Sequence, residues 1–363
     1  MMKKITCLRN KVKKIDCKII KLVQRRFDIT RNIGKEKKKL GIPLQDWSVE
    51  RDVIDNALDM AKRVGLNYDL VKTLITKIIE QSRLQQEKLH YSTYSGNRED
   101  ILIVGGLGAM GHWFANFFQN QGHSVSICDI QPKGINGFKY YRNLKYALKG
   151  KTFLLISTPL STVPRIINMA TNFGYKGVVC DIASIKGHIV SSIKRAVSNG
   201  VKITSIHPMF GPSCQTLTDK VICLCDCGLP SANQMVLNFF KNTAVKIVNL
   251  SFEEHDRIIC YVLGLSHLIN ILFISTLINS GYDYADLKSI ASTTFNSQLT
   301  TTFSVIHENP ELYYEIQALN PYNNKLFKNL KMNLDELIEM IEGGKRDIFK
   351  EVFNKGRQWL DGH

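Results

Sequence analysis

The sequence predicts a multidomain chain in which an all-α domain is followed by an α/β domain with a doubly wound parallel sheet and by a second all-α domain. Residues 1–90 place apolar residues at helical spacing, residues 99–250 alternate short β-branched runs with helical stretches, and the pattern after residue 250 is helical. We therefore expect domains at 1–90, 99–250 and 251–363, joined by a polar linker at 91–98. With 363 residues, each part has enough chain to bury a core.

Cysteine use and the N-terminal sequence predict a cytoplasmic protein. The nine cysteines are an odd number, are scattered through mostly apolar runs and include no CxxC pair of the metal-binding type. They are typical of reduced core thiols, so we expect neither disulfides nor a bound metal. The N-terminal residues are interrupted by lysines every few positions and form no apolar signal core.

The formal charge of +16 is unevenly distributed. Residues 1–90 contain 22 Lys and Arg against 11 Asp and Glu, which would draw an anionic ligand to that end of the chain. Nucleic acid is one candidate, but the basic residues lack interleaved aromatics and a recognisable binding motif. A solvated helix face is another interpretation. We expect no nucleic-acid partner.

One uncharged segment, residues 258–282, is long enough to span a bilayer. It also holds polar residues such as His267 and Asn270. Since the rest of the chain has the pattern of a water-soluble protein, we expect a helix buried in a domain core or a dimer interface and no membrane partner.

The first helix is predicted to be long and to carry one apolar seam. Steps of four and three residues connect the members of this seam, which are Leu8, Val12, Ile15, Ile19, Leu22, Arg26, Ile29 and Ile33. A helix from about residue 5 to 40 would be roughly 50 Å long. Two short helices cannot cover that length, so the seam implies pairing with a second chain.

Polar residues occupy inward positions in this helical domain. Lys37 continues the seam of the first helix, and the two helices that follow bring acids and amides to the same side. A buried cation is costly unless it meets an anion or good acceptors. We therefore predict a small polar pocket formed by Arg26, Lys37, Glu50, Ser82 and Gln86. The alternative is a set of internal salt bridges with snorkelling side chains.

The segments LRNKVKKID, QRR, IGKEKK and SRLQQ resemble the helical chorismate mutase domain that is fused to enzymes of tyrosine and phenylalanine synthesis. The resemblance implies an intertwined homodimer in which Arg9 reaches the partner's pocket and Arg26 binds a substrate carboxylate. Lys37 and Gln86 would hydrogen-bond the ether oxygen of chorismate, with Ser82 also in the pocket. Such a cationic cage suits an intramolecular rearrangement, which needs no nucleophile.

The same resemblance implies that Asp46 and Glu50 face the substrate hydroxyl. The sequence departs from the family just before this glutamate, where Val49 replaces a usual arginine. We expect this replacement to weaken mutase activity.

A glycine-rich unit from Ile101 to Asp129 predicts a dinucleotide site. The run Gly105-Gly106-Leu107-Gly108-Ala109-Met110-Gly111 follows a β-branched strand and opens a helix, and the next strand ends at Asp129. Gly106 would permit the tight turn, Gly108 the approach of the pyrophosphate, and Gly111 the packing of helix on sheet. Asp129 would bind the ribose hydroxyls and repel a 2′-phosphate, so the cofactor is NAD rather than NADP. The alternative is a glycine loop that merely turns.

The continuation of this unit supports a Rossmann domain. Two further apolar runs of the parallel-sheet kind end in Ser157-Thr158-Pro159 and Ala183-Ser184. Ligands bind at the carboxyl ends of such strands, so Thr158 and Pro159 are candidates for cofactor contact. The next run delivers His207 at its end, either as an acid–base group or as a hydrogen-bonded core histidine.

The motifs GGLGAMG, DIASIKG, HPMFGP and EHD resemble prephenate dehydrogenase, and their order after a mutase domain resembles the bifunctional T-protein family. This implies that His207 polarises the ring hydroxyl of prephenate as hydride leaves for NAD. Ser184 would orient His207, Lys186 would approach cofactor or substrate, and His267 would line the pocket. Their alternatives are a strand-end cap, an exposed lysine and a core histidine.

A second departure concerns prephenate binding. The family's carboxylate-binding arginine falls on Ser304, and no arginine occurs between Arg257 and Arg346. Losing a bidentate partner weakens binding, which Lys288, Lys325 or Arg257 would have to offset. The leading hypothesis is a bifunctional enzyme of tyrosine biosynthesis. The alternatives are the same architecture with one activity weakened or lost, or an NAD-binding domain fused to a basic helical binding module.

Overall fold

The computed structural model describes residues 2–40, 47–90, 98–131, 137–214, 217, 220–241, 243 and 245–362. Side chains at 2, 3, 38, 47–51, 80, 83–90 and 120 are not described. The chain divides into two compact units. The first comprises Met1–Thr158, Thr162–Ala183 and Ser191–Leu250, and the second comprises Pro159–Ser161, Ser184–Val190 and Ser251–His363. This division does not separate residues 1–90 from the sheet, so the predicted boundaries near residues 90 and 98 stay predictions.

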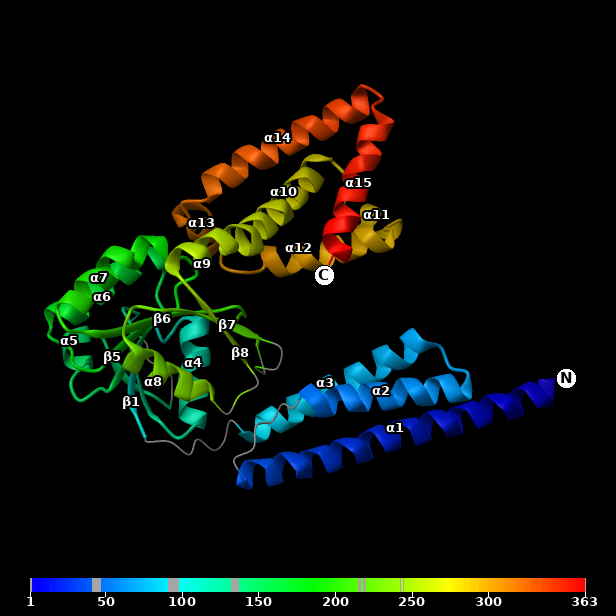
Figure 1. The fold of residues 1–363 in the computed structure, drawn as a ribbon, viewed down its shortest axis with the longest axis horizontal. Helices are drawn as coiled ribbons and strands as arrows, with labels where there is room; N and C mark the ends of the chain where they lie inside the picture. Colours follow the sequence, from blue (N-terminus) through cyan, green and yellow to red (C-terminus); the bar gives the residue numbers. More distant parts are fainter. Residues whose placement is uncertain are drawn as a thin grey trace. The chain divides into compact units, whose positions relative to one another are not determined.

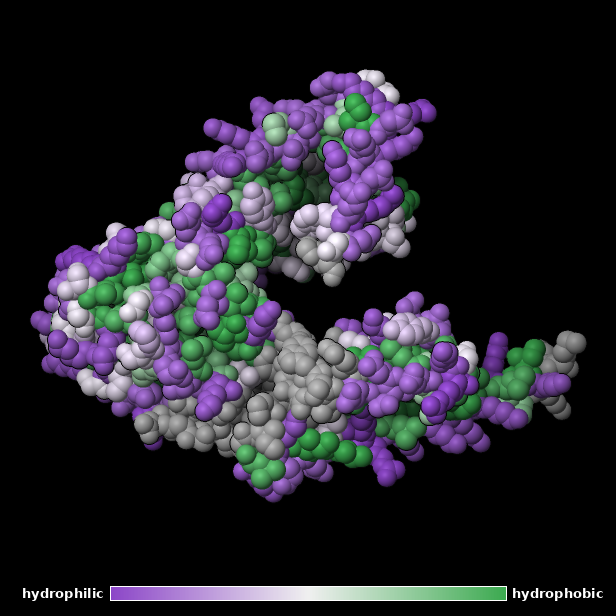
Figure 2. Space-filling model, in the orientation of Figure 1, coloured by the Kyte–Doolittle hydropathy of each residue, from purple (hydrophilic) through white to green (hydrophobic). Residues whose placement is uncertain are grey.

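The N-terminal part is a set of three helices, as predicted: α1 (Met2–Lys39), α2 (Trp47–Val64) and α3 (Tyr68–His90). α3 packs against both α1 and α2. The apolar seam of α1 is largely uncovered, with Leu8, Ile15 and Leu22 between 52% and 63% exposed. Figure 2 shows apolar residues at the surface of α1 near the N-terminus. The expected linker at 91–98 lies outside the described residues except for Arg98.

The sheet of the α/β part has eight strands in the order β3-β2-β1-β4-β5-β6-β7-β8 (Figure 1). The strands are β1 (Asp100–Val104), β2 (Ser124–Cys128), β3 (Lys139–Tyr141), β4 (Phe153–Ile156), β5 (Val178–Asp181), β6 (Lys202–Pro208), β7 (Val221–Cys225) and β8 (Lys246–Leu250). All pairs are parallel except β6 with β7. The order of the strands reverses between β1 and β4: β2 and β3 lie on one side of this point, and β4 and β5 on the other. Doubly wound sheets bind ligands at such a point.

Helices flank this sheet: α4 (Ala109–Asn120), α5 (Leu144–Ala147), α6 (Val163–Asn172), α7 (Val190–Ser198) and α8 (Pro230–Phe240). Two 3-10 turns, η1 (Leu160–Thr162) and η2 (Gly187–Ile189), precede α6 and α7. α4 and α8 supply an aromatic core over one face of the sheet, including Phe114, Phe118 and Phe239. Successive strand residues point to opposite faces, and both sets are buried, which explains the continuous apolar runs in the sequence.

The C-terminal part is helical, as predicted: α9 (Phe252–Ile259), the π-helical segment η3 (Cys260–Leu265), α10 (Ser266–Asn279), α11 (Tyr284–Ser289), α12 (Thr293–Ile306), α13 (Pro310–Leu319), α14 (Asn323–Glu342) and α15 (Arg346–Asp361). The stretch Phe252–Asn279 has the length and composition of a membrane span, and 28% of its most apolar window is buried. The predicted helix is present, and its burial in a domain core or a dimer interface stays a prediction. Ile258 and Leu272 are among its exposed apolar residues.

All nine cysteines lie among the described residues, and none of them forms a disulfide bond. The prediction of core thiols is wrong for Cys7 and Cys17, which are exposed on α1. Their positions fall on the polar side of a helix rather than in a strand. No group of three or more His, Cys, Asp or Glu side chains suited to a metal ion occurs in the described part of the chain.

Candidate active sites

Arg26 and Ser82 come together between α1 and α3. The guanidinium Nη1 of Arg26 donates to Ser82 Oγ over 2.6 Å and to the carbonyl oxygen of Ile78 over 3.5 Å. Ser82 Oγ in turn donates to the Ile78 oxygen over 2.8 Å. Burial lowers the pKa of Arg26. Its described partners are all neutral, which leaves its positive charge for an anionic ligand.

A pocket of about 370 Å³ opens beside the C-terminal half of α1. Its described lining residues are Ile29, Asn32, Ile33, Glu36, Lys37 and Leu40. Lys37 is half-buried there, about three helical turns beyond Arg26 on the same seam. Arg26 is not among the described lining residues of this pocket. The alternative of internal salt bridges finds no support at Arg26, since the ion pairs described on α1, Arg31–Asp28 and Lys39–Glu36, are on its exposed side.

The other predicted mutase residues are less fully described. Arg9 is exposed on α1. Its predicted contact with the pocket of a partner subunit stays a prediction. Glu50 lies in α2 and Gln86 in α3, but their side chains are not described, and the same holds for Val49. Asp46 lies outside the described residues.

The glycine loop between β1 and α4 is packed too tightly for side chains. A Cβ on Gly111 would lie 2.2 Å from the carbonyl oxygen of Gly105, and one on Gly106 would lie 2.6 Å from Ile127. Gly105 has φ of +81°, and a Cβ there would lie 2.2 Å from the Ser157 oxygen. α4 begins after Gly108, which provides no side-chain cap. Its first amides are therefore available to a pyrophosphate.

Asp129 reaches back to this loop from the end of β2. Its Oδ2 accepts from Leu107 N over 3.1 Å, and its Oδ1 accepts from Gln131 N over 3.2 Å. The carboxylate is thus fixed beside the glycine turn, where the adenosine ribose of a dinucleotide would lie. The tight loop, the open helix terminus and this acid fit NAD.

The two loops that follow β4 and β5 hold the next candidates. Thr158 Oγ1 accepts from Thr162 Oγ1 over 2.9 Å, and its methyl group lies against Gly105, so it borders the glycine loop. Pro159 is exposed, Ser184 half-buried. Lys186 is 0% exposed, so the alternative of an ordinary surface lysine is wrong. Its backbone amide donates to Asp256 of α9, which lies 70 residues farther along the chain.

His207 stands at the carboxyl end of β6 with 4% of its surface exposed. It is paired across the antiparallel β6–β7 ladder with Cys223, so the two side chains share one face of the sheet. Asp181, at the end of β5, is fully buried and accepts from Ala183 N over 3.0 Å. That contact is typical of a structural acid.

His267 follows the π-helical segment η3. Its ring stacks on Tyr313, with centroids 4.1 Å apart, and burial lowers the pKa of His267 to about 4. Its Nδ1 has no hydrogen-bond partner among the described atoms. π-Helical turns are frequent at functional sites because the extra residue redirects side chains. The sequence analysis did not predict a role for Tyr313.

Ser304, the position of the missing arginine, is exposed on α12, and its hydroxyl donates to Thr300 O over 3.2 Å. The three suggested replacements are exposed as well. Lys288 contacts Asn296, Arg257 lies 3.8 Å from Glu253, and Lys325 lies in α14. The structure does not bring any of them to His267.

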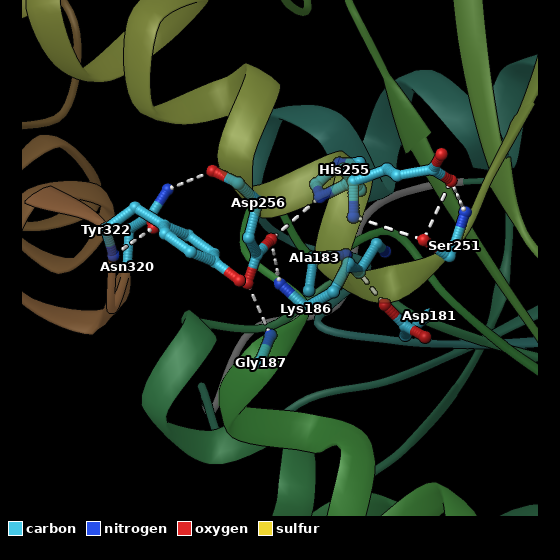
Figure 3. A network of polar contacts seen from close by, with 10 residues as sticks. Asp181, Ala183, Lys186, Gly187, Ser251, His255, Asp256, Asn320 and Tyr322 are labelled. Atoms are coloured by element: carbon cyan, nitrogen blue, oxygen red, sulfur yellow. Dashed lines mark hydrogen bonds and ion pairs between the residues drawn. The ribbon is translucent and has the colours of Figure 1, made fainter.

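Two acidic residues in the C-terminal unit were missed by sequence reasoning. Asp256 accepts from the backbone amides of Lys186 and Gly187 (Figure 3), and Glu315 accepts from those of Leu160 and Ser161. Both contacts join segments far apart in the sequence. The EHD motif was the only signal that could have pointed to Asp256.

Three family models match successive parts of the chain. "Chorismate mutase type II" matches residues 8–87, "Prephenate dehydrogenase, nucleotide-binding domain" residues 114–249, and "Prephenate dehydrogenase, dimerization domain" residues 251–355. Their order is that of the three predicted parts. The glycine loop lies just before the second match, and its geometry supports a dinucleotide site independently.

Two curated relatives are similar over nearly the whole chain. The T-protein of Enterobacter agglomerans is 23% identical over 363 residues, which cover 100% of this chain and 95% of the relative. The T-protein of Haemophilus influenzae is 22% identical over 354 residues, which cover 97% and 91%.

Among solved structures, prephenate dehydrogenase from Aquifex aeolicus in complex with hydroxyphenyl propionate and NAD+ has a TM-score of 0.61 at 19% identity, covering 74% of this chain and 100% of that one. Synechocystis arogenate dehydrogenase has a TM-score of 0.55 at 17% identity, covering 72% and 99%. These likenesses establish the fold of the α/β and C-terminal parts.

Proposed function

We propose that this chain, which belongs to the bifunctional T-protein family of chorismate mutase/prephenate dehydrogenases, makes 4-hydroxyphenylpyruvate from chorismate in two steps of tyrosine biosynthesis. The N-terminal helices rearrange chorismate to prephenate. The α/β and C-terminal parts oxidise and decarboxylate prephenate with NAD. The observation that carries this proposal is the presence, on one chain, of a half-buried arginine without an anionic partner in its described contacts and of a dinucleotide loop closed by Asp129.

The mutase step requires stabilisation of charge rather than a reacting side chain. Arg26 would bind a carboxylate of the chorismate dianion, held in direction by Ser82. Lys37, farther along α1, would donate a hydrogen bond to the ether oxygen of chorismate as the bond between that oxygen and carbon breaks. Because both cations lie on one rigid helix, their spacing selects the compact conformer of the substrate.

The dehydrogenase step places the other candidates around the ring of prephenate. NAD, when bound, accepts the hydride from C4. The glycine loop and the first turn of α4 would hold the pyrophosphate, Asp129 the adenosine ribose, and Thr158 and Pro159 the neighbouring part of the cofactor. His207 would accept the proton of the ring hydroxyl, and loss of the ring carboxylate as CO2 completes aromatisation.

Ser184, Lys186 and His267 are proposed to complete the substrate site. Burial keeps His267 neutral near pH 7, since it lowers its pKa to about 4. A neutral ring stacked on Tyr313 can offer one hydrogen bond to prephenate without adding charge.

We also propose that the protein acts as a cytoplasmic homodimer. The exposed seam of α1 and the exposed apolar residues of α9, η3 and α10 are two surfaces that a second copy would cover. Sedimentation of the purified chain and of an Ile19→Asp variant would test this. A monomeric wild-type chain would contradict the proposal.

A second candidate function is the same architecture with one activity weakened. Ser304 in place of an arginine favours it, and the suggested replacements Arg257, Lys288 and Lys325 are all exposed. The deciding experiment supplies chorismate and NAD to the purified protein and follows chorismate loss and NADH formation separately. Chorismate loss without NADH formation would show that the dehydrogenase activity is absent. Prephenate added directly would then test the dehydrogenase site alone.

A further inference from the structure

Two loops at the carboxyl end of the sheet belong to the C-terminal unit rather than to the α/β unit. They are Pro159–Ser161, after β4, and Ser184–Val190, after β5. β4 and β5 are neighbours in the sheet, so these loops follow adjacent strands. In the proposed function the first loop contacts the cofactor and the second carries two substrate-site residues. Their attachment therefore bears on how the dehydrogenase site is assembled.

Asp256 holds the second loop. This residue of α9 is 1% exposed, and its Oδ1 accepts from Lys186 N over 2.8 Å while its Oδ2 accepts from Gly187 N over 2.6 Å (Figure 3). His255 Nδ1 lies 2.8 Å from the same Oδ1. The main-chain oxygen of Asp256 accepts from Asn320 Nδ2 over 2.9 Å. The carboxylate is thus fixed by its surroundings as well as by its helix.

Glu315 holds the first loop in the same way. This residue of α13 accepts from Leu160 N over 2.7 Å with Oε2 and from Ser161 N over 3.1 Å with Oε1. In both loops the two bonded amides belong to consecutive residues at the start of a 3-10 turn, η1 or η2. Such amides have no partner within the turn, and an anion there also interacts favourably with the local dipoles.

His188 joins the two loops. Its Nε2 lies 2.8 Å from the carbonyl oxygen of Leu160. A continuous path of hydrogen bonds therefore runs from Glu315 through Leu160 and His188 to the loop bonded by Asp256. All members of this path lie in the C-terminal unit.

We propose that Asp256 and Glu315 are positioning residues for prephenate oxidation: they fix the cofactor loop and the substrate loop to the helical domain as one assembly. This inference rests on the proposed function. Neither carboxylate touches the reacting atoms; each acts through the backbone it holds. Hydride transfer is sensitive to displacements of about 1 Å, so loosening either loop lowers the rate without removing a reacting group.

The test compares Asp256→Asn and Glu315→Gln with wild type by amide hydrogen exchange. Each substitution replaces one acceptor oxygen by an NH2 donor that faces a backbone N–H, so one loop amide loses its partner. Asp256→Asn should accelerate exchange in residues 184–190 at least about tenfold, and Glu315→Gln should do so in residues 159–162. Glu253→Gln is the matched control, because Glu253 lies on the same helix as Asp256 but is exposed, and its side chain contacts those of Arg257 and Tyr322.

Kinetics provides the second readout. We expect Asp256→Asn to lower kcat for prephenate oxidation about 10- to 100-fold with little change in NAD affinity, and Glu315→Gln to weaken NAD binding measured by calorimetry. Asp256→Glu, which keeps both oxygens on a longer side chain, should recover part of kcat. Chorismate mutase activity of the same chain should remain at the wild-type rate in all variants.

Unchanged exchange in both loops would overturn the proposal, as would kcat and mutase activity that fall in parallel with thermal stability, since Asp256 would then be a core residue only. If Asp256→Asn does not fold, the half-buried Glu315→Gln decides by the same readouts. If the wild type formed no NADH from prephenate, the proposed function would be refuted instead. The exchange rates would still test whether Asp256 and Glu315 hold the two loops.

Discussion

Arg26 on α1 donates a 2.6 Å hydrogen bond to Ser82 on α3, although 56 residues separate them in the sequence. The bond fixes a cation in a partly buried position where no described side chain neutralises it. We predict that Arg26→Gln lowers kcat of chorismate mutase about 10²- to 10³-fold, the usual effect of removing one donor to a developing charge. Chorismate loss at its ultraviolet band measures this. Arg25→Gln, at the adjacent exposed position, should keep the wild-type rate.

His207 is predicted to matter for the dehydrogenase alone. His207→Asn should lower kcat for prephenate oxidation about 10²- to 10⁴-fold, because the proton of the ring hydroxyl loses its acceptor. NADH formation from prephenate gives the rate, and chorismate loss by the same preparation serves as the control. A variant that still forms NADH at the wild-type rate would identify His207 as the hydrogen-bonded core histidine of the alternative interpretation.

Asp129 is predicted to determine cofactor choice. Asp129→Ser removes two charge-assisted hydrogen bonds to the ribose and the repulsion of a 2′-phosphate. We expect KM for NAD to rise about tenfold or more and NADP to become a usable substrate. Initial rates with each dinucleotide at saturating prephenate test this. If the wild type used both cofactors equally, the proposed role of Asp129 would be wrong.

Gly111 tests the fit of α4 on the glycine loop. Gly111→Ala would place a Cβ 2.2 Å from Gly105 O, which is backbone and cannot move aside. We expect a loss of about 1–3 kcal/mol in the free energy of unfolding, together with weaker NAD binding. Gly356→Ala is the matched control in α15, where nothing lies within 4 Å of the added carbon. That change should stabilise its helix by up to about 1 kcal/mol.

We predict that His267 makes the free energy of unfolding depend on pH. Burial lowers its pKa from 6.5 to about 4, so below pH 6.5 the unfolded chain binds a proton that the folded chain does not. Stability is therefore greatest above pH 6.5 and falls as the pH decreases toward 4. His123, whose pKa burial also lowers to about 4, contributes in the same range. His267→Gln should reduce the slope of unfolding free energy against pH between 4 and 6.5, leaving the part due to His123. A slope equal to the wild-type slope would contradict the assignment.

Local pattern was sufficient for the order of domains and the identity of the dinucleotide loop. The steps of four and three residues in α1 arise from the helical repeat itself. The glycine run depends on steric demands within about 25 residues, and a Cβ on Gly106 or Gly111 would meet neighbouring atoms. The seam also placed Arg26 inward. These features depend on residues that are close together in the sequence, so the sequence alone is sufficient to predict them.

Tertiary structure alone decided the surroundings of Lys186 and the roles of Asp256 and Glu315. A lysine in a loop is ordinarily exposed, and two acids on amphipathic helices are ordinarily solvated. Here the lysine is buried, and Asp256 of α9 and Glu315 of α13 accept hydrogen bonds from backbone amides of the loops after β4 and β5. Those contacts span 70 and 155 residues, and no periodicity within either segment encodes them. The sequence thus determined which chemistry each part supplies, and the fold decided which residues hold the parts of the second site in place.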